Sequence, residues 1–186
     1  MFNRVSEIPK DVNIQRQLTE MHIKEWQQND VFQAKWYLLI LAVIVVWVIW
    51  WIFLDKSRFS EISLFVVFSI ILFLGVHEYG EELTLWDYPT DIIPVFPPMS
   101  SINLVCLPVI YSLVYQHFSQ RKSFILADII TSAAICFIFE PLLSWAQFYA
   151  LLHWNYLFNF IIYAAITIFI RTVLTKIYDK VGTRRI

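Results

Sequence analysis

The sequence predicts an all-α fold, an integral membrane bundle of five transmembrane helices with an N-terminal polar, amphipathic helix. Three observations lead to this fold class. The 186-residue chain is 59% hydrophobic and only 16% charged, whereas soluble domains are about 45–50% apolar and about 25% charged. The apolar residues form long continuous blocks, unlike the alternating pattern of barrel strands. Lys and Arg are distributed unevenly among the links between these blocks, which is typical of multipass membrane proteins.

Residues 1–35 form a polar leader of mixed charge ahead of the first apolar block. Ile14, Leu18 and Met21 recur at i, i+4 and i+7, which predicts a helix over residues 14–32. Two interpretations stay open: a helix that rests on the lipid headgroups, or a solvated, partly disordered leader. The leader lacks the apolar core of a cleavable signal peptide, so we expect the internal apolar segments to direct insertion.

Five blocks approach the roughly 20 apolar residues that a helix needs to cross a bilayer core about 30 Å thick. We expect each to be a helix, because lipid-exposed backbone must satisfy its own amides. The expected spans are residues 36–54, 59–77, 102–118, 123–145 and 154–171. They make up a transmembrane domain over residues 36–175, which a basic tail over residues 176–186 follows.

The links predict how these spans are oriented in the cell membrane. Residues 77–101 and 146–153 contain no Lys or Arg, whereas the other two links and the tail do. This asymmetry places the N-terminus and residues 77–101 outside and the C-terminus in the cytoplasm. The five basic residues of the leader oppose this orientation, although only Lys24 and Lys35 lie close enough to the first span to count strongly.

The second link begins with the stretch HEYGEELTLWDYPTDIIPVFPP, residues 77–98, which contains five acids and one histidine. If a helix continues past Gly80, His77 and Glu81 share one face, a spacing that suits two metal ligands. The zinc signature HExxH would require a second histidine at position 81, and zinc favours nitrogen and sulfur ligands. A helix end at Gly80 is the alternative, with the acids exposed in a solvated link. We expect no metal and no cofactor here.

The fourth span carries a second polar feature, Glu140 followed by Pro141. A charge at the centre of a span costs about 2.5–3.5 kcal/mol on insertion scales, so such residues usually face partners or water. Pro141 also removes the donor that would meet the carbonyl of Phe137. These features predict a polar pocket at the outer leaflet. Its candidate residues are Glu140, Glu78, His77, Glu81, Glu82 and Asp87.

A structural role for Glu140, protonated and hydrogen-bonded to a neighbouring helix, is the alternative. We also expect structural roles within the membrane for Asp128, Asn103, Pro141 and Pro108. Asp128 lies about one turn inside the basic end of its span, where Arg121 or Lys122 could reach it as an ion pair.

Several motifs of the chain resemble those of a family of small multipass membrane proteins, of about five spans, from spore-forming Firmicutes. The pieces that carry the resemblance are EYGEELTLWDYPTDIIPVFP (78–97), LPVIYSLVYQHF (107–118) and FIFEPLLSW (137–145). The family has no agreed activity, so the resemblance implies the fold and not a reaction. In the family the positions equivalent to His77 and Asn103 are commonly Asp, and the position equivalent to Thr84 is commonly Gly.

Two functions from different classes remain after this survey. The first is a structural or regulatory membrane protein whose outer face contacts a membrane-protein partner or a second copy of the chain. The alternative is binding of a small molecule, lipid or ion, as an enzyme or transporter, at an outer-leaflet pocket around Glu140 and residues 77–91. The chain has no phosphate loop or nucleophile elbow, which argues against an enzyme. A net charge of −1 without a basic stripe argues against nucleic acid as a partner.

Overall fold

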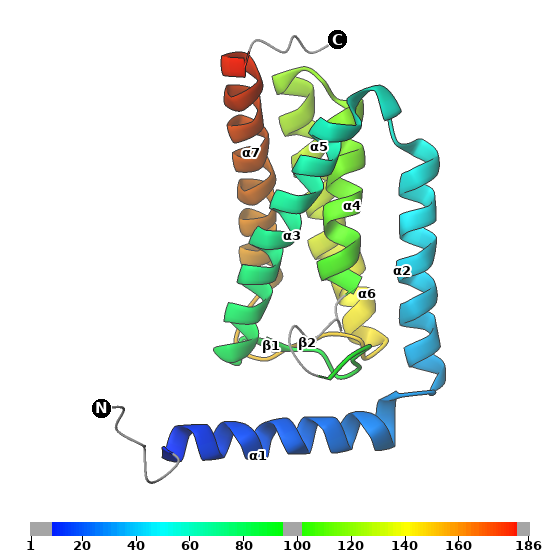
Figure 1. The fold of residues 1–186 in the computed structure, drawn as a ribbon, viewed down its shortest axis with the longest axis vertical. Coiled ribbons are helices and arrows are strands. Elements are labelled where there is room, and N and C mark those ends of the chain that lie inside the picture. Colours follow the sequence, from blue (N-terminus) through cyan, green and yellow to red (C-terminus); the bar gives the residue numbers. More distant parts are fainter. Residues whose placement is uncertain (1–8, 95–101, 182–186) are drawn as a thin grey trace, which may run out of the picture.

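The computed structural model describes residues 9–94 and 102–181, and within these it leaves out the side chains of residues 102–104 and 181. The described chain is predominantly helical (Figure 1). Its α-helices are α1 (Lys10–Glu25), α2 (Ala34–Phe53), α3 (Phe59–Glu82), α4 (Ile102–His117), α5 (Arg121–Ala134), α6 (Glu140–Trp145) and α7 (Tyr156–Val181). Two π-helical turns, Trp26–Asp30 and Ile135–Phe139, and a 3₁₀ turn, Lys56–Arg58, extend or join these helices.

Four helical segments of the described chain are long and apolar enough to cross a membrane, which indicates a membrane location. They are Ala34–Phe53, Lys56–Glu82, Arg121–Trp145 and Tyr156–Lys180. They correspond to the first, second, fourth and fifth expected spans. The third expected span is the shorter helix α4, which contains Pro108 and is not among the four.

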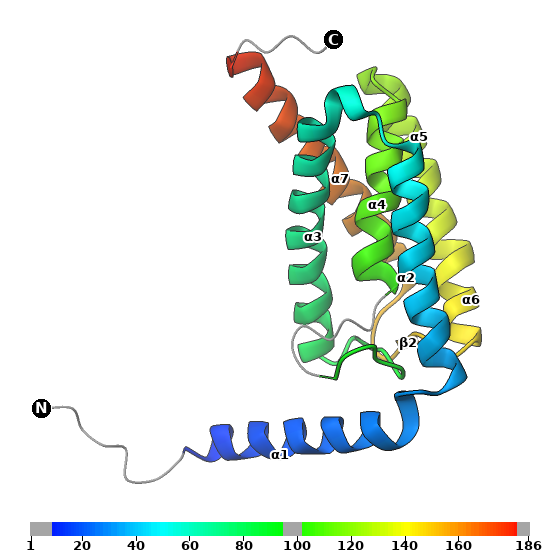
Figure 2. The ribbon, with the colours of Figure 1, turned by 45° about the vertical axis from the view of Figure 1, so that its right-hand side comes forward.

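The long helices run side by side, with α1 across one end of the bundle (Figures 1 and 2). We call this end, where β1 and β2 also lie, the α1 end. The opposite end, which holds the links between α2 and α3 and between α4 and α5, is called the basic end. The interior between α3, α4, α5 and α7 is filled largely by aromatic side chains. The largest of these are Phe65, Phe73, Tyr111, Tyr115 and Tyr163.

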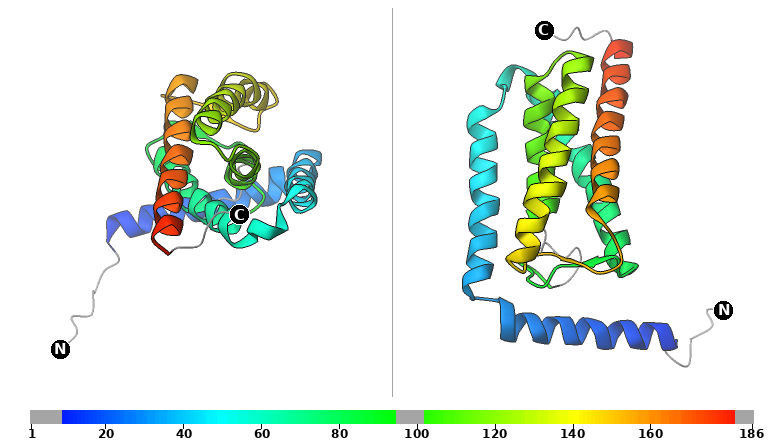
Figure 3. Two further views of the ribbon diagram at one scale, coloured as in Figure 1. Left: turned by 90° about the horizontal axis from the view of Figure 1, so that it is seen from above. Right: turned by 180° about the vertical axis from the view of Figure 1, so that it is seen from behind.

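Helix α2 lies at the edge of the bundle and packs mainly on α4 (Figure 3). The indole Nε1 of Trp50 donates a hydrogen bond of 2.9 Å to the hydroxyl of Ser112. Around this bond Trp50 packs with Ile62, Val66 and Val109 in a second apolar cluster. Most other side chains of α2 are exposed and apolar, as expected of a helix that faces lipid on several sides.

The leader forms a helix that begins at Lys10, earlier than the expected residue 14, and continues through a π-helical turn to Asp30. Phe32 then has a φ of 64°, and this left-handed residue turns the chain sharply into α2. The helix lies crosswise beneath the bundle (Figure 2), and its apolar residues are exposed: Val12, Ile14, Leu18 and Met21. This geometry fits the interpretation of a helix on the headgroups.

Helix α3 continues past Gly80 to Glu82, five residues beyond the expected end of the second span. It ends where Thr84 adopts a left-handed conformation with a φ of 54°. The N–H of Thr84 then donates to the carbonyl of Glu81, and the N–H of Leu85 donates to that of Gly80. This pair of bonds is a Schellman motif, so the backbone at Thr84 rather than the glycine ends the helix.

A short antiparallel ladder closes the α1 end. Strand β1 (Trp86–Asp87) follows the Schellman motif of α3, and strand β2 (Ala150–Leu151) follows α6. In the ladder Trp86 is paired with Leu151 and Asp87 with Ala150. The ladder therefore ties the end of α3 to the chain that leads into α7.

Candidate functional site

Glu140, at the start of α6, is fully buried against α7. Asn159 of α7 donates from its side-chain nitrogen to Glu140 Oε2 over 2.9 Å and to the hydroxyl of Tyr149 over 3.1 Å. The Asn159 oxygen in turn accepts a bond of 2.8 Å from the indole of Trp154. Asn159 thus uses both amide hydrogens and its oxygen. A buried carboxyl is costly without such partners, so Asn159 is a structural partner of Glu140.

His77 belongs to the same part of the interior, although it comes from α3. Its Nδ1 lies 2.6 Å from the hydroxyl of Tyr88, just after β1. Its ring is 6.0 Å from the ring of Tyr163, whose hydroxyl is in electrostatic contact with the Glu140 carboxyl. The rings of Tyr88 and Tyr149 are 5.5 Å apart. His77 and Glu140 are therefore connected through aromatic side chains.

We call this set of side chains the buried polar cluster: His77, Tyr88, Glu140, Tyr149, Asn159 and Tyr163. The ladder β1–β2 covers it from the α1 end, and Trp86 packs beside Tyr88 and Tyr149. Burial raises the pKa of the Tyr149 hydroxyl above its ordinary value, so this hydroxyl stays protonated. Among the described residues none forms a hydrogen bond with His77 Nε2.

The other four candidate residues, Glu78, Glu81, Glu82 and Asp87, lie outside this cluster. They line a surface hollow of about 580 Å³ between the end of α3, the chain after β1 and the leader helix. We call it the acidic hollow. Seven of its described lining residues are acidic and none is Lys or Arg. These acids are Glu25, Asp30, Glu78, Glu81, Glu82, Asp87 and Asp91.

Three hydrogen bonds hold the leader helix and the start of α2 against the chain after β1. The indole of Trp26 donates to the carbonyl of Asp91 over 3.0 Å, and that of Trp36 to the carbonyl of Ile92 over 3.1 Å. The N–H of Asp91 donates to Asp30 Oδ2 over 3.4 Å. Partial burial raises the pKa of Asp30, although this N–H opposes the shift. The hollow therefore depends on docking of the leader.

The acids of the hollow surround it without converging on one point. In the part of the chain that the structure describes, no group of three or more His, Cys, Asp or Glu side chains could hold a metal ion. His77 and Glu81 share α3, but His77 faces the buried polar cluster and Glu81 faces the hollow. The metal-ligand interpretation of their i, i+4 spacing thus has no support in this geometry.

Asp128 differs from its expected role as an ion-pair partner of Arg121 or Lys122. The carboxyl is fully buried, and Thr167 of α7 donates to its Oδ1 over 2.5 Å. Among the described residues, no ion pair joins Asp128 to Arg121 or to Lys122. Asp128 is on the inward face of α5, whereas Arg121 and Lys122 are exposed at its start. The predicted ion pair was wrong because Asp128 and the two cations lie on different faces of α5, which the sequence spacing did not reveal.

The two prolines sit in different helical contexts. Pro141 is in the first turn of α6, directly after the π-helical turn Ile135–Phe139. The helical backbone is continuous through Pro141, within the segment Arg121–Trp145, and the wider π turn just before it accommodates the missing N–H. Pro108 is inside α4. The side chain of Asn103 lies outside the described residues.

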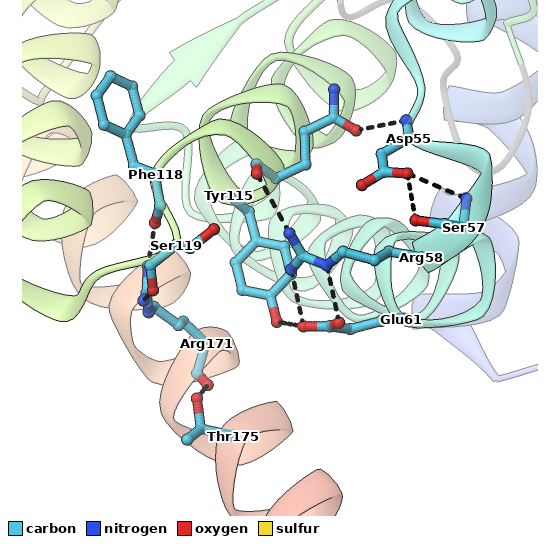
Figure 4. Close-up of polar contacts among 10 residues, drawn as sticks. Asp55, Ser57, Arg58, Glu61, Tyr115, Phe118, Ser119, Arg171 and Thr175 are labelled. Carbon is cyan, nitrogen blue, oxygen red and sulfur yellow. Dashed lines mark hydrogen bonds and ion pairs between the residues drawn. The ribbon is translucent and has the colours of Figure 1, made fainter. Parts of the chain in front are cut away.

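A polar cluster at the basic end was missed by sequence reasoning. Arg58 donates to both carboxylate oxygens of Glu61, over 3.2 and 3.1 Å, and to the carbonyl of Gln116 over 3.2 Å (Figure 4). The hydroxyl of Tyr115 also donates to Glu61. The expected spans place Arg58 in a link and Glu61 at the start of the second span, and no contact between them is predicted, although their i, i+3 spacing at a helix start is a signal for such a pair.

Arg171 of α7 completes this end of the bundle. Its guanidinium donates to the carbonyl of Phe118 over 2.8 Å and to that of Ser119 (Figure 4). Its charged centre also lies 4.4 Å from the ring centre of Phe124. These contacts satisfy carbonyls at the end of α4, which a helix leaves without partners. Arg171 therefore fixes the link between α4 and α5 onto α7.

Comparisons of the chain with protein-family models, with curated proteins and with solved structures found no match.

Proposed function

We propose that the chain is a five-span membrane protein with a structural or regulatory role, whose outer face binds a basic segment of a partner protein in the acidic hollow. The observation that carries this proposal is the composition of the hollow, seven acids and no Lys or Arg among its described lining residues. Such a concentration of one charge raises the local concentration of cations and orients a partner of opposite charge.

The shape of the hollow favours a peptide segment over a bare ion. Its volume of about 580 Å³ is within the range of about 300–1,000 Å³ usual for ligand sites. The carboxylates are spread around this volume, and no described trio could hold a metal ion. Trp26 and Tyr88 also line it, and aromatic rings bind Arg and Lys side chains through cation–π contacts. Several basic side chains in an extended segment match this arrangement.

The orientation and the fifth crossing are part of the proposal. Helix α4 runs alongside the four apolar helices and packs on α2, α3 and α5, which supports a crossing by α4 as well (Figure 3). The basic links lie at the end opposite the acidic hollow, which supports a cytoplasmic basic end in the cell membrane. The resemblance to five-span proteins of spore-forming Firmicutes is in keeping with this arrangement. The proposal places the chain in the lipid bilayer and makes its partner a membrane protein.

The alternative function, a small-molecule, lipid or ion site around Glu140, has one supporting observation. Two atoms of the buried polar cluster, His77 Nε2 and Glu140 Oε1, are buried and, among the described residues, have no hydrogen-bond partner. Against it, Glu140 is held by Asn159 and four of the six candidate residues lie in the separate acidic hollow. The geometry thus supports the interaction surface better.

The test uses the full chain in nanodiscs of neutral lipid and a deca-arginine peptide as the probe. The variant Glu82→Gln/Asp87→Asn removes two exposed charges from the hollow. The matched control Asp11→Asn/Glu20→Gln removes two exposed charges from α1 outside it. We expect the hollow variant to weaken peptide binding about tenfold and the control to change it less than about twofold.

Equal weakening by both variants would overturn the proposal, because binding would then depend on overall charge alone. No binding by the unaltered protein would overturn it as well. Orientation is tested separately, with single cysteines placed at Glu82 and Lys180 and a membrane-impermeant thiol reagent on whole cells. We expect labelling at position 82, which the proposed orientation places outside, and none at position 180, which it places in the cytoplasm. The two natural cysteines, Cys106 and Cys136, are buried and should add little background.

A further inference from the structure

A second hollow, of about 280 Å³, lies at the basic end between the start of α5 and the last part of α7. Three of its described lining residues are cationic and none is acidic: Arg121, Arg171 and Lys176. Three hydroxyl-bearing residues, Ser119, Thr172 and Thr175, complete its polar wall. We call it the basic pocket. The hydroxyls of Thr172 and Thr175 donate to the carbonyls of Ile168 and Arg171, so the cations are the groups of this wall that can bind phosphate.

Two of the three cations of the basic pocket, Arg121 and Lys176, are available for a ligand. Among the described residues, neither Arg121 nor Lys176 forms a hydrogen bond or an ion pair, and both are exposed. Arg171 holds its charge in a fixed place, because its guanidinium is bonded to the carbonyls of Phe118 and Ser119. A fixed cation flanked by two exposed ones can contact an anion from more than one side.

The remaining wall of the pocket is apolar and lies at the depth of the hydrocarbon core. Phe124, Ile125 and Ile168 form it. Along α7, at roughly 1.5 Å per residue, Ile168 lies about 18 Å and Lys176 about 30 Å from Tyr156. A hydrocarbon core about 30 Å thick thus ends near Lys176. By this measure Lys176 lies at headgroup depth, Arg171 lies about 8 Å deeper, and Ile168 lies at acyl-chain depth.

We propose that the basic pocket binds the phosphate of an anionic phospholipid from the adjacent leaflet. The phosphate lies between Arg121 and Lys176, near the fixed charge of Arg171, and an acyl chain follows Ile125 and Ile168. A lipid accounts for both walls of the pocket, whereas a soluble phosphate would use only the polar one. Basic pockets between transmembrane helices bind anionic headgroups in this way. The choline group of a zwitterionic lipid would be repelled by the three cations.

The experiment measures lipid retained by the purified full chain in neutral detergent, by native mass spectrometry, with phosphatidylglycerol or phosphatidylcholine added. The test variant is Arg121→Gln/Lys176→Gln. The matched control, Lys122→Gln/Lys180→Gln, removes the same charge from the same two helices at the same end, but from side chains that do not line the pocket. A thermal unfolding transition verifies that each purified protein is folded. If a double variant does not fold, the two corresponding single variants are measured in its place.

We expect the unaltered protein to retain phosphatidylglycerol in preference to phosphatidylcholine. The pocket variant should weaken retention of phosphatidylglycerol about tenfold or more, and the control less than about twofold. Equal losses in both variants, or no preference between the two lipids, would overturn the proposal. Displacement of the lipid by an equal concentration of glycerol phosphate would assign the pocket to a soluble anion instead. None of these outcomes depends on the acidic hollow, at the other end of the bundle.

Discussion

The indole ring of Trp86 lies against the backbone of Gly80, so close that a Cβ atom at Gly80 would be 1.9 Å from Cζ2 of the ring. Trp86 belongs to strand β1 of the ladder, and its side chain is buried beside Tyr88 and Tyr149. The absence of a side chain at position 80 therefore allows the ladder to pack onto the end of α3.

Replacing Gly80 by Ala should lower the free energy of unfolding by about 1–3 kcal/mol, because the added methyl group displaces Trp86. Gly75, one helical turn away, has nothing within 4 Å of a Cβ position. Gly75→Ala is thus the matched control and should stabilise the helix by about 0.5–1 kcal/mol. Unfolding in mixed micelles measures both. Equal effects of the two substitutions would contradict the close contact at Gly80.

Replacing Thr84 by Gly should stabilise the protein. Thr84 occupies the C′ position of a Schellman motif with a φ of 54°, where Gly is preferred. A β-branched residue in this conformation costs roughly 1–2 kcal/mol, of which the greater chain entropy of Gly in the unfolded state offsets part. We expect a net gain of about 0.5–1 kcal/mol in unfolding experiments. A loss of stability would mean that the Thr84 side chain makes a compensating contact.

Glu140 and Asn159 should respond unequally to substitution. Glu140→Gln keeps an oxygen that can accept the Asn159 bond, so we expect a change of less than about 1 kcal/mol. Asn159→Ala removes the bonds to Glu140, Tyr149 and Trp154 together and should cost about 2–4 kcal/mol, because buried polar groups lose their partners. The comparison is made by unfolding at neutral pH. Equal costs would contradict the role of Asn159 as the bridging residue.

Docking of the leader helix should strengthen at low pH. Partial burial raises the pKa of Asp30 in the docked state, so docking takes up a proton. The stabilisation from this group is present at low pH and is lost as the pH rises through the raised pKa. Spin labels at cysteines placed at Glu20 and Glu82 report the distance between α1 and α3. The Asp30→Asn variant should reduce the pH dependence, and an unchanged dependence would assign it to the other acids of the hollow.

Much of the helical framework follows from the sequence, because continuous apolar blocks leave few alternatives to helices in lipid. Helix ends were predicted less well. Gly80 is a usual helix terminator, yet α3 passes through it and ends at Glu82, just before the left-handed Thr84; what requires a glycine at position 80 is the space that Trp86 fills. That requirement comes from a residue beyond the helix, so no local pattern reveals it.

The candidate site was likewise predicted only in part. The sequence pointed to His77, Glu140 and the acids of the link, but it could not separate inward from outward faces. The structure places His77 and Glu140 in the buried polar cluster and the four other acids in the acidic hollow. The leader wall of that hollow could not be predicted, because it depends on the bond from Trp26 to Asp91, 65 positions away in the sequence.

The ladder β1–β2 has a consequence for biosynthesis. Its two strands are separated by α4, α5 and α6, so a ribosome delivers the second strand only after these helices have left the exit tunnel. Until then Trp86 has no partner strand, and the part of the buried polar cluster that is already synthesised is not covered by the ladder. Closure of the ladder is thus a late step of assembly, and nascent chains arrested before Ala150 should be more sensitive to proteolysis after α3 than the released protein.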